Sequence, residues 1–162
     1  MIQKSLSISY EEYARREELE EKDKGLILAA EKAMKDAYAP YSNFKVGAAL
    51  RLEDDTIVIG NNQENSAYPS GLCAERVALF SASAQYPNKK IIDAAIIASG
   101  SVFVVESPIP PCGACRQVFA EYENKQKHKI RYILASEKGK IQIFHGILDL
   151  LPFSFFSDYL EK

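Results

Sequence analysis

The sequence has few cysteines, almost no excess of charge of either sign and no long apolar run. Its three cysteines are an odd number, which suits metal binding better than a disulfide framework and favours a reducing compartment. Twenty basic residues stand against 22 acidic ones, so no strong basic field follows the phosphates of a long nucleic acid. No apolar run reaches the roughly 20 residues that cross a bilayer, and no signal-peptide core is present. We therefore expect a cytoplasmic protein that binds neither nucleic acid nor a membrane.

The length and composition predict one domain with its own apolar core. Hydrophobic residues make up 47% of the 162 residues, which argues against disorder, and we find no linker or internal repeat. Residues 9–12 read Ser-Tyr-Glu-Glu, the form of a capping box, and a charged stretch follows over residues 15–24. We expect a single domain over residues 1–162, with a helical extension over about residues 1–24.

The rest of the chain alternates helices with strands. Apolar residues recur at helical spacing from Leu26 to Ala37, and Pro40 closes that helix. Residues 99–110 fit either a short strand or a loop. Helices interleaved with strands predict a sheet covered on both faces. The other expected elements are a hairpin over 44–60, a helix over about 73–85, a strand over 91–98, a helix after Pro111, strands over 129–135 and 141–144, and a short helix over 147–151.

All three cysteines lie in two short motifs. Residues 73–76 read Cys-Ala-Glu-Arg, and residues 110–116 read Pro-Pro-Cys-Gly-Ala-Cys-Arg. Three thiolates hold zinc and leave a fourth position open for water, and Glu75 then supplies an acid/base beside that water. A ligand-x-Glu followed by Pro-Cys-x-x-Cys is the signature of the zinc deaminases. We therefore predict one Zn²⁺ per chain, with these ligands: Cys73, Cys112 and Cys115.

Arg76 is the expected partner of the ligand sulfurs. Three thiolates around a divalent zinc leave one excess negative charge, which makes the metal a poorer Lewis acid. Arg76 lies three residues after Cys73 and shares a helix face with it, so its guanidinium can donate to the sulfurs. The alternative for Arg76 is a surface salt bridge. The two histidines, His128 and His145, lie outside the motifs, and we interpret both as structural.

Three further stretches give the chain a family resemblance. Residues 39–44 read Ala-Pro-Tyr-Ser-Asn-Phe, residues 62–68 read Asn-Gln-Glu-Asn-Ser-Ala-Tyr, and residues 150–155 read Leu-Leu-Pro-Phe-Ser-Phe. With the cysteine motifs, in this order, the chain resembles the small homo-oligomeric nucleoside cytidine deaminases over about residues 25–160. The resemblance implies a three-layer α/β/α sandwich with a five-stranded mixed sheet. It also implies zinc-dependent hydrolysis of cytidine and 2′-deoxycytidine to uridine and 2′-deoxyuridine, with release of ammonia.

The same resemblance implies a set of substrate contacts. Phe44 matches the aromatic residue that stacks on the base, and Asn62 and Glu64 match the pair that hydrogen-bonds the ribose hydroxyls. Tyr68 and Phe155 match positions that reach a neighbouring subunit's site, which implies a homotetramer with shared active sites.

The C-terminal tail supports an interface. Phe155, Phe156, Tyr159 and Leu160 place apolar surface on a short tail after a proline break, and exposed apolar patches of this kind mark interfaces. Whether Phe153 or Phe155 reaches the neighbouring site stays open.

Two other functions compete with this one. A deaminase of a related nucleoside, such as a blasticidin-type antibiotic, would share the metal site and differ in its sugar contacts. A non-catalytic zinc-binding module would leave Glu75 and the open coordination position without a purpose. An editor of polynucleotides is disfavoured because the loops near the motifs carry no basic cluster.

Overall fold

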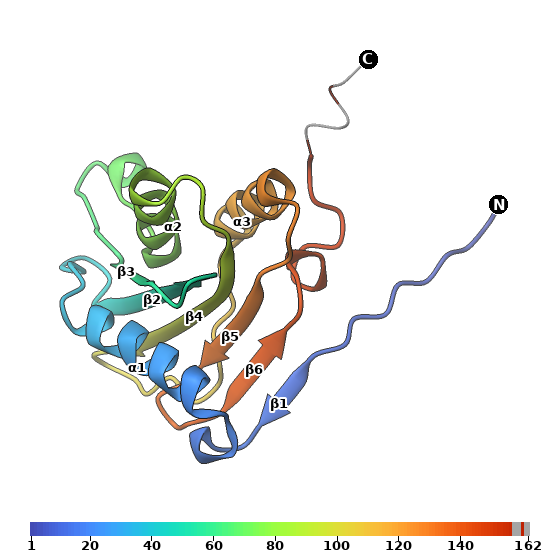
Figure 1. Ribbon diagram of the computed structural model, residues 1–162. Helices are drawn as coiled ribbons and strands as arrows, with labels where there is room; N and C mark the ends of the chain where they lie inside the picture. Colours follow the sequence, from blue (N-terminus) through green and yellow to red (C-terminus); the bar gives the residue numbers. More distant parts are fainter. Residues whose placement is uncertain (157–159, 161–162) are drawn as a thin grey trace.

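The computed structural model describes residues 1–156 and residue 160, and its centre is one mixed sheet (Figure 1). The strand order is β1-β6-β5-β4-β2-β3, with β4 and β5 parallel and every other neighbouring pair antiparallel. The sheet is mixed, as expected, but it has six strands instead of five. The strands are β1 (Glu11–Tyr13), β2 (Phe44–Leu52), β3 (Ile57–Asn61), β4 (Ile91–Gly100), β5 (Arg131–Ala135) and β6 (Ile141–Phe144).

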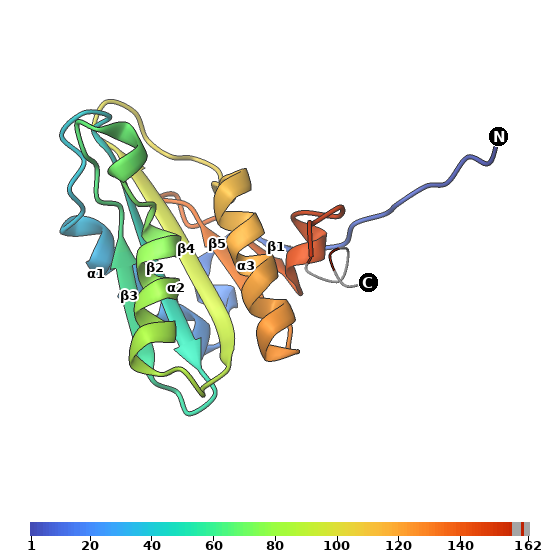
Figure 2. The same cartoon turned by 90° about the horizontal axis from the view of Figure 1, so that it is seen from above.

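Helices cover both faces of the sheet, as Figures 1 and 2 show. Helix α1 packs on one face with Ala49, Ile97 and Ile133 beneath it, and α2 and α3 pack on the other. The predicted three-layer α/β/α sandwich is thus confirmed, with two apolar cores. The helices are α1 (Glu21–Lys35), α2 (Ala74–Gln85) and α3 (Gly113–Gln126), and the short 3-10 helices are η1 (Arg16–Glu18), η2 (Tyr68–Ser70) and η3 (Ile147–Asp149).

A glycine on β3 lets α2 approach the sheet closely. A Cβ on Gly60 would lie 2.4 Å from the backbone nitrogen of Ala78 and 2.5 Å from the carbonyl oxygen of Ala74. Both distances are shorter than real Cβ contacts, so a side chain at this position would push the first turn of α2 away. Because that turn follows Cys73, Gly60 helps to fix the position of the first cysteine.

The prediction of a helical extension over about residues 1–24 is wrong. Residues 11–13 form β1, which pairs with β6, and α1 begins only at Glu21. Contacts with β6 override the local helix signal: Glu11 bonds His145 at 2.6 Å, and Gln142 donates to Glu12 at 2.9 Å. This strand is the sixth of the sheet.

Residues 101–112 form a loop, which settles the alternative left open by the sequence. Strand β4 continues to Gly100, and the loop after it is fastened to the turn beyond β5. The carboxylate of Glu137 accepts hydrogen bonds from the Val105 backbone at 2.7 Å and the Ser99 hydroxyl at 2.8 Å. The loop therefore passes over the end of the sheet where the cysteine motifs lie.

Candidate metal and substrate site

Two helix starts bring the three cysteines together. Cys73 is the N-cap of α2, Cys112 is the N-cap of α3, and Cys115 lies in the first turn of α3. Their sulfur atoms all lie within 4.8 Å of one another, and the Cys112 and Cys115 sulfurs are 3.5 Å apart. A tetrahedral zinc with Zn–S bonds of about 2.3 Å needs sulfurs ~3.8 Å apart. The three-cysteine cluster therefore fits one Zn²⁺.

The electrostatics of the cluster favour a thiolate. A hydrogen bond from the Cys115 thiol, together with the Arg76 guanidinium, lowers the pKa of Cys73 to about 5. The same hydrogen bond, followed by burial, raises the pKa of Cys115. Free N–H groups at the helix starts also stabilise negative charge. Since thiolate is the form that binds metal, the cluster has the donor chemistry that zinc requires.

Arg76 points at the sulfur cluster. Its Nη2 donates to the Cys73 sulfur at 3.5 Å, and this contact raises the pKa of the guanidinium. Its Nε is buried and has no hydrogen-bond partner among residues 1–156 and 160. Within that part of the chain Arg76 forms no salt bridge. The geometry thus agrees with a partner of the sulfurs and disagrees with a surface ion pair.

Neither histidine belongs to the cluster. His145 is exposed and bonds Glu11 on β1, and His128 follows the far end of α3. Among the described residues, the group that could hold a metal consists of three cysteines without a histidine or carboxylate.

Glu75 is buried beside the cysteines. It is 5% exposed, and burial raises the pKa of its carboxyl group. A carboxylate with a raised pKa is a better proton acceptor near neutral pH. Glu75 lines a cavity of about 280 Å³. Five other residues singled out from the sequence line the same cavity: Phe44, Asn62, Glu64, Cys73 and Cys112.

The two predicted ribose contacts, Asn62 and Glu64, are held by the start of β2 and by the turn just before it. The Asn62 side chain donates to the Phe44 carbonyl at 2.9 Å and accepts from the Val46 backbone at 2.8 Å. Its amide keeps one N–H and one lone pair for another partner. The Glu64 carboxylate accepts from the Ser42 hydroxyl and from the Tyr41 backbone at 2.9 Å. These bonds, chiefly the one from Ser42, lower the pKa of Glu64, so it stays an acceptor.

Sequence reasoning missed two contributors to the site. Ser42, which orients Glu64, sits inside the 39–44 motif, but its role depends on a turn that the sequence does not define. Phe103, from the loop after β4, stacks on Phe44 with ring centroids 6.1 Å apart. The sequence shows an apolar run over residues 102–105, but the contact of Phe103 with Phe44 depends on the path of the loop.

Tyr68 and Phe155 lie outside the cavity that contains Glu75. Tyr68 is exposed and lines an adjoining hollow of about 430 Å³ that also includes Arg76 and Cys73. Phe155 is fastened to α3, because Gln117 bonds both its backbone carbonyl at 2.7 Å and its backbone N–H at 3.2 Å. Within one chain, neither residue therefore lines the cavity of Glu75. The tail residue Tyr159 lies outside the described residues.

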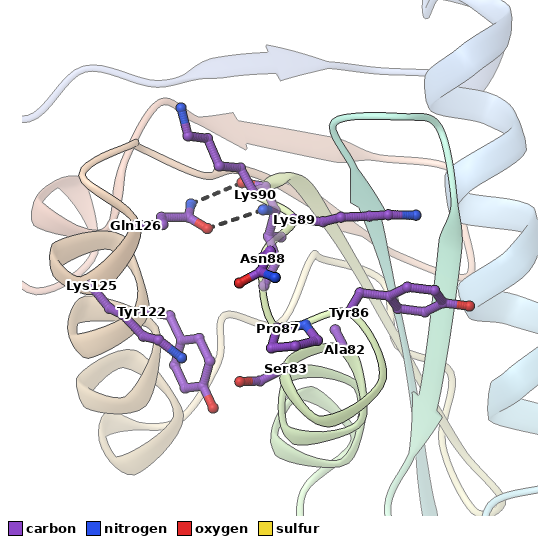
Figure 3. A pocket seen from close by; sticks show the side chains of 11 residues that line it. Ala82, Ser83, Tyr86, Pro87, Asn88, Lys89, Lys90, Tyr122, Lys125 and Gln126 are labelled. Atoms are coloured by element: carbon purple, nitrogen blue, oxygen red, sulfur yellow. Dashed lines mark hydrogen bonds between the residues drawn. The ribbon is translucent and has the colours of Figure 1, made fainter.

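A third pocket lies at the opposite ends of α2 and α3 (Figure 3). Its volume is about 180 Å³, and Gln126 closes one wall by bonding the backbone of Ile91. Lys89 lies over the Tyr86 ring, and Lys125 lies over the Tyr122 ring. The pocket contains no thiol and no carboxylate, so it has neither metal ligands nor an acid/base.

Comparisons with known proteins agree with this geometry. A family model described as the cytidine and deoxycytidylate deaminase zinc-binding region matches residues 20–128. A cytidine deaminase of Sporosarcina psychrophila is 42% identical over 136 residues, which cover 84% of this chain and 93% of that protein. A cytidine deaminase of Halalkalibacterium halodurans is 45% identical over 96 residues, or 59% of this chain and 68% of that protein.

A solved structure extends the likeness to the fold. The crystal structure of a cytidine deaminase from Burkholderia pseudomallei superposes with a TM-score of 0.71 at 41% identity, covering 82% of this chain and 98% of that one. Fold and thiol cluster together are those of a zinc-binding deaminase domain. The chain belongs to the cytidine and deoxycytidylate deaminase family, which confirms the resemblance and the zinc ion predicted from the sequence.

Proposed function

We propose that this chain is a zinc-dependent hydrolase that converts cytidine and 2′-deoxycytidine, with one water, to uridine and 2′-deoxyuridine plus ammonia. The observation that carries the proposal is the single cavity onto which Cys73, Cys112 and the buried Glu75 open beside Asn62 and Glu64. The family and the two deaminase relatives support the same reaction.

The reaction needs an attacking water and a path for its protons. Zinc bound by the thiolates of Cys73, Cys112 and Cys115 would supply a Lewis acid that lowers the pKa of a water toward about 7. The Glu75 carboxylate takes a proton from the water that attacks C4 of the cytosine ring and gives it to the ring nitrogen N3. Glu75 then takes the remaining proton from the hydroxyl on C4 and passes it to the amino group. As C4=O forms, the C4–N bond breaks and the amino group leaves as ammonia.

Side chains around the cavity bind the substrate. The Phe44 ring stacks on the cytosine, supported on its other side by Phe103. The ionised Glu64 carboxylate accepts hydrogen bonds from the ribose hydroxyls. The Asn62 amide uses its remaining N–H to donate to them and its remaining lone pair to accept from them. Arg76 draws charge from the ligand sulfurs through its contact with Cys73.

A loss-of-absorbance assay with purified protein tests the reaction. We expect turnover of cytidine and deoxycytidine, and none of CMP or adenosine. A zinc-loaded protein that turns over none of these would contradict the proposal and favour a non-catalytic zinc-binding module. Turnover confined to an antibiotic such as blasticidin would identify a deaminase of related nucleosides.

We further propose that residues 1–162 form one domain that works as a cytoplasmic homotetramer with shared active sites. Three thiols in one metal cluster suit a reducing compartment. Among the described residues, no helix is long and apolar enough to cross a membrane. Tyr68 is 77% exposed beside the cavity, and Phe155 exposes much of its ring on the tail. Both suit contact with a neighbouring subunit.

If active sites are shared between subunits, variants of the C-terminal tail should impair substrate binding and assembly. Phe155→Ala should raise KM for cytidine without changing zinc content, because its ring closes a neighbour's pocket. Deleting residues 153–162 should weaken assembly and activity, and mixing that truncation with a Glu75→Gln chain should restore part of the activity. A matched Phe153→Ala variant shows which aromatic acts. A fully active monomer in light scattering would refute sharing while leaving the reaction intact.

A further inference from the structure

Residues 1–10 form an extended arm that leaves the domain. In both views the arm continues the line of β1 and projects beyond the sheet (Figures 1 and 2). Residues 1–9 make no hydrogen bond to any other described residue. Strand β6 ends at Phe144, and Gly146, with φ of 159°, turns the chain away. Among residues 1–156 and 160, the arm thus has no strand of its own domain left to pair with. It also precedes the region that the family model matches, which begins at residue 20.

The arm has the alternation of a strand with one apolar face. Even-numbered positions carry Ile2, Leu6, Ile8 and Tyr10, with Lys4 as the one charged residue among them, while the odd positions from 3 to 11 carry Gln, Ser, Ser, Ser and Glu. Such period-2 alternation is typical of a half-buried strand. Yet Leu6 is 62% exposed and Ile8 46% exposed. The apolar face is formed but uncovered within one chain.

The face to which the arm belongs is fixed at its base. Tyr10 stacks on Phe144 with ring centroids 5.1 Å apart, and Phe144 belongs to the core under α2 and α3. Even-numbered arm residues therefore face the α3 side of the sheet. Among the described residues, β1 has a strand neighbour on one edge only, which is β6. Its other edge offers unpaired N–H and C=O groups to a further strand.

The arm and this edge are complementary to each other in antiparallel register. With Ile8 of one copy opposite Ile8 of a second, Leu6 lies opposite Tyr10 and Lys4 lies opposite Glu12. On the polar face, serines then meet a serine and a glutamate. A shift of two residues in either direction puts Glu12 opposite Ile2 or Leu6 instead. Cross-strand pairs of opposite charge and of apolar residues stabilise a sheet, so one register stands out.

We propose that the arm pairs with the β1 edge of a second copy of this chain, across a two-fold axis at Ile8, and joins the two sheets into one. The two-fold axis makes the contact self-complementary, because each arm covers the other copy's edge. The pairing satisfies the arm's backbone, covers Leu6 and Ile8, and adds a Lys4–Glu12 ion pair on each side. This contact is separate from the shared active site and does not depend on the proposed reaction.

A cross-linking experiment on the full chain tests the register. Opposite side chains in an antiparallel pair have Cβ atoms about 4.5–5.5 Å apart, so Ile8→Cys should form a covalent dimer under mild oxidation of the zinc-loaded protein. Ser5→Cys is the matched control, because two copies of residue 5 would lie six residues apart along the strands, roughly 20 Å. Equal cross-linking of both variants, or none for Ile8→Cys, would overturn the proposal.

Charge reversal tests the pairing without a new cysteine. Lys4→Glu and Glu12→Lys should each raise the dissociation constant for self-association in sedimentation roughly fivefold or more, and the double variant should restore it. Deleting residues 1–10 should weaken association at least as much, with zinc content and deaminase turnover unchanged. Association unaffected by the deletion, or a double variant worse than both single ones, would show that the arm binds no second copy.

Discussion

Two groups of buried ionisable side chains lie on opposite faces of the sheet, and they differ in how their charges are satisfied. On the α1 face, two aspartates and two arginines form a closed network. The Asp93 carboxylate accepts from Arg51 at 2.8 Å and from Arg131 at 2.7 Å, and Asp23 accepts from both arginines. Two negative and two positive charges cancel, so this group contains no charge without a partner.

The group on the α2 and α3 face is open, in the sense that its ionisable groups and donors are not all paired with one another among the described residues. Glu75 is buried with its pKa raised, three sulfurs crowd together, and the Arg76 Nε has no partner among the described residues. Leaving polar groups unsatisfied in a protein interior costs free energy. In the proposed function, a bound metal and substrate would complete the site and offset this cost. A closed network holds a fold together, whereas an open one beside a cavity is available for chemistry.

Removing a metal ligand should have the largest effect. Cys112→Ala leaves two thiolates, too few to hold a catalytic zinc, so we expect loss of zinc and of measurable turnover. Metal analysis of the purified variant, with circular dichroism to verify folding, checks this. Gly113→Ala is the matched control, since a Cβ there meets nothing within 4 Å. Full zinc occupancy in Cys112→Ala would contradict the ligand assignment.

Neutralising the buried glutamate should separate metal binding from catalysis. Glu75→Gln keeps the shape of the side chain but cannot shuttle protons. A general acid/base typically contributes about 10²–10⁴-fold, so we expect turnover to fall by at least that factor while zinc is retained. The control is Glu123→Gln, on α3 and outside the cavity, where the carboxylate accepts from the backbones of Ile130 and Ile147. Glu75→Gln activity within tenfold of the unmodified protein would refute the role.

Breaking the closed network should affect stability and spare the reaction. Asp93→Ala leaves Arg51, only 7% exposed, with a single remaining carboxylate. Removing one partner of a buried ion pair costs about 3–5 kcal/mol, so we expect that loss in the free energy of unfolding by urea titration. Zinc content and kcat of the folded protein should not change. Asp54→Ala is the control: it removes an exposed partner of Lys89 and should shift the unfolding midpoint little.

The open group could be predicted from the sequence, and the closed one could not. Cysteines and Glu75 are recognisable because metal chemistry restricts residue type and spacing over a few positions. The closed network joins residues far apart, such as Asp23 and Arg131, which are 108 positions apart. Nothing in local composition marks such pairs, because only the packing of α1 on the sheet brings them together.

The N-terminal segment shows how one local signal can hide another. Ser9 to Glu12 has the form of a helix cap, but the alternation from Ile2 to Tyr10 has the period of a strand. The strand forms because this segment contacts the edge strand β6 and the residue after it: Tyr10 stacks on Phe144, and Glu11 bonds His145. The contact of Phe103 with Phe44 was equally hidden, since it depends on the path of a loop.

The smallest expected effect concerns Arg76, which contacts the sulfur cluster through Cys73. Arg76→Gln removes the charge that the Cys73 sulfur contacts at 3.5 Å. Side chains that bond metal ligands typically contribute about 10–100-fold to metal affinity or activity, so turnover should fall within that range and zinc should be lost more readily to a chelator. Arg76→Lys keeps the charge without the planar donor group and should retain more activity than Arg76→Gln.

Arg116→Gln is the matched control, because Arg116 donates to the carbonyl oxygens of Pro111 and Leu150. The Arg116→Gln variant should have a lower free energy of unfolding, and it should lose zinc to a chelator no faster than the unmodified protein. Equal chelator sensitivity in Arg76→Gln and the unmodified protein would show that Arg76 acts on something other than the ligand sulfurs.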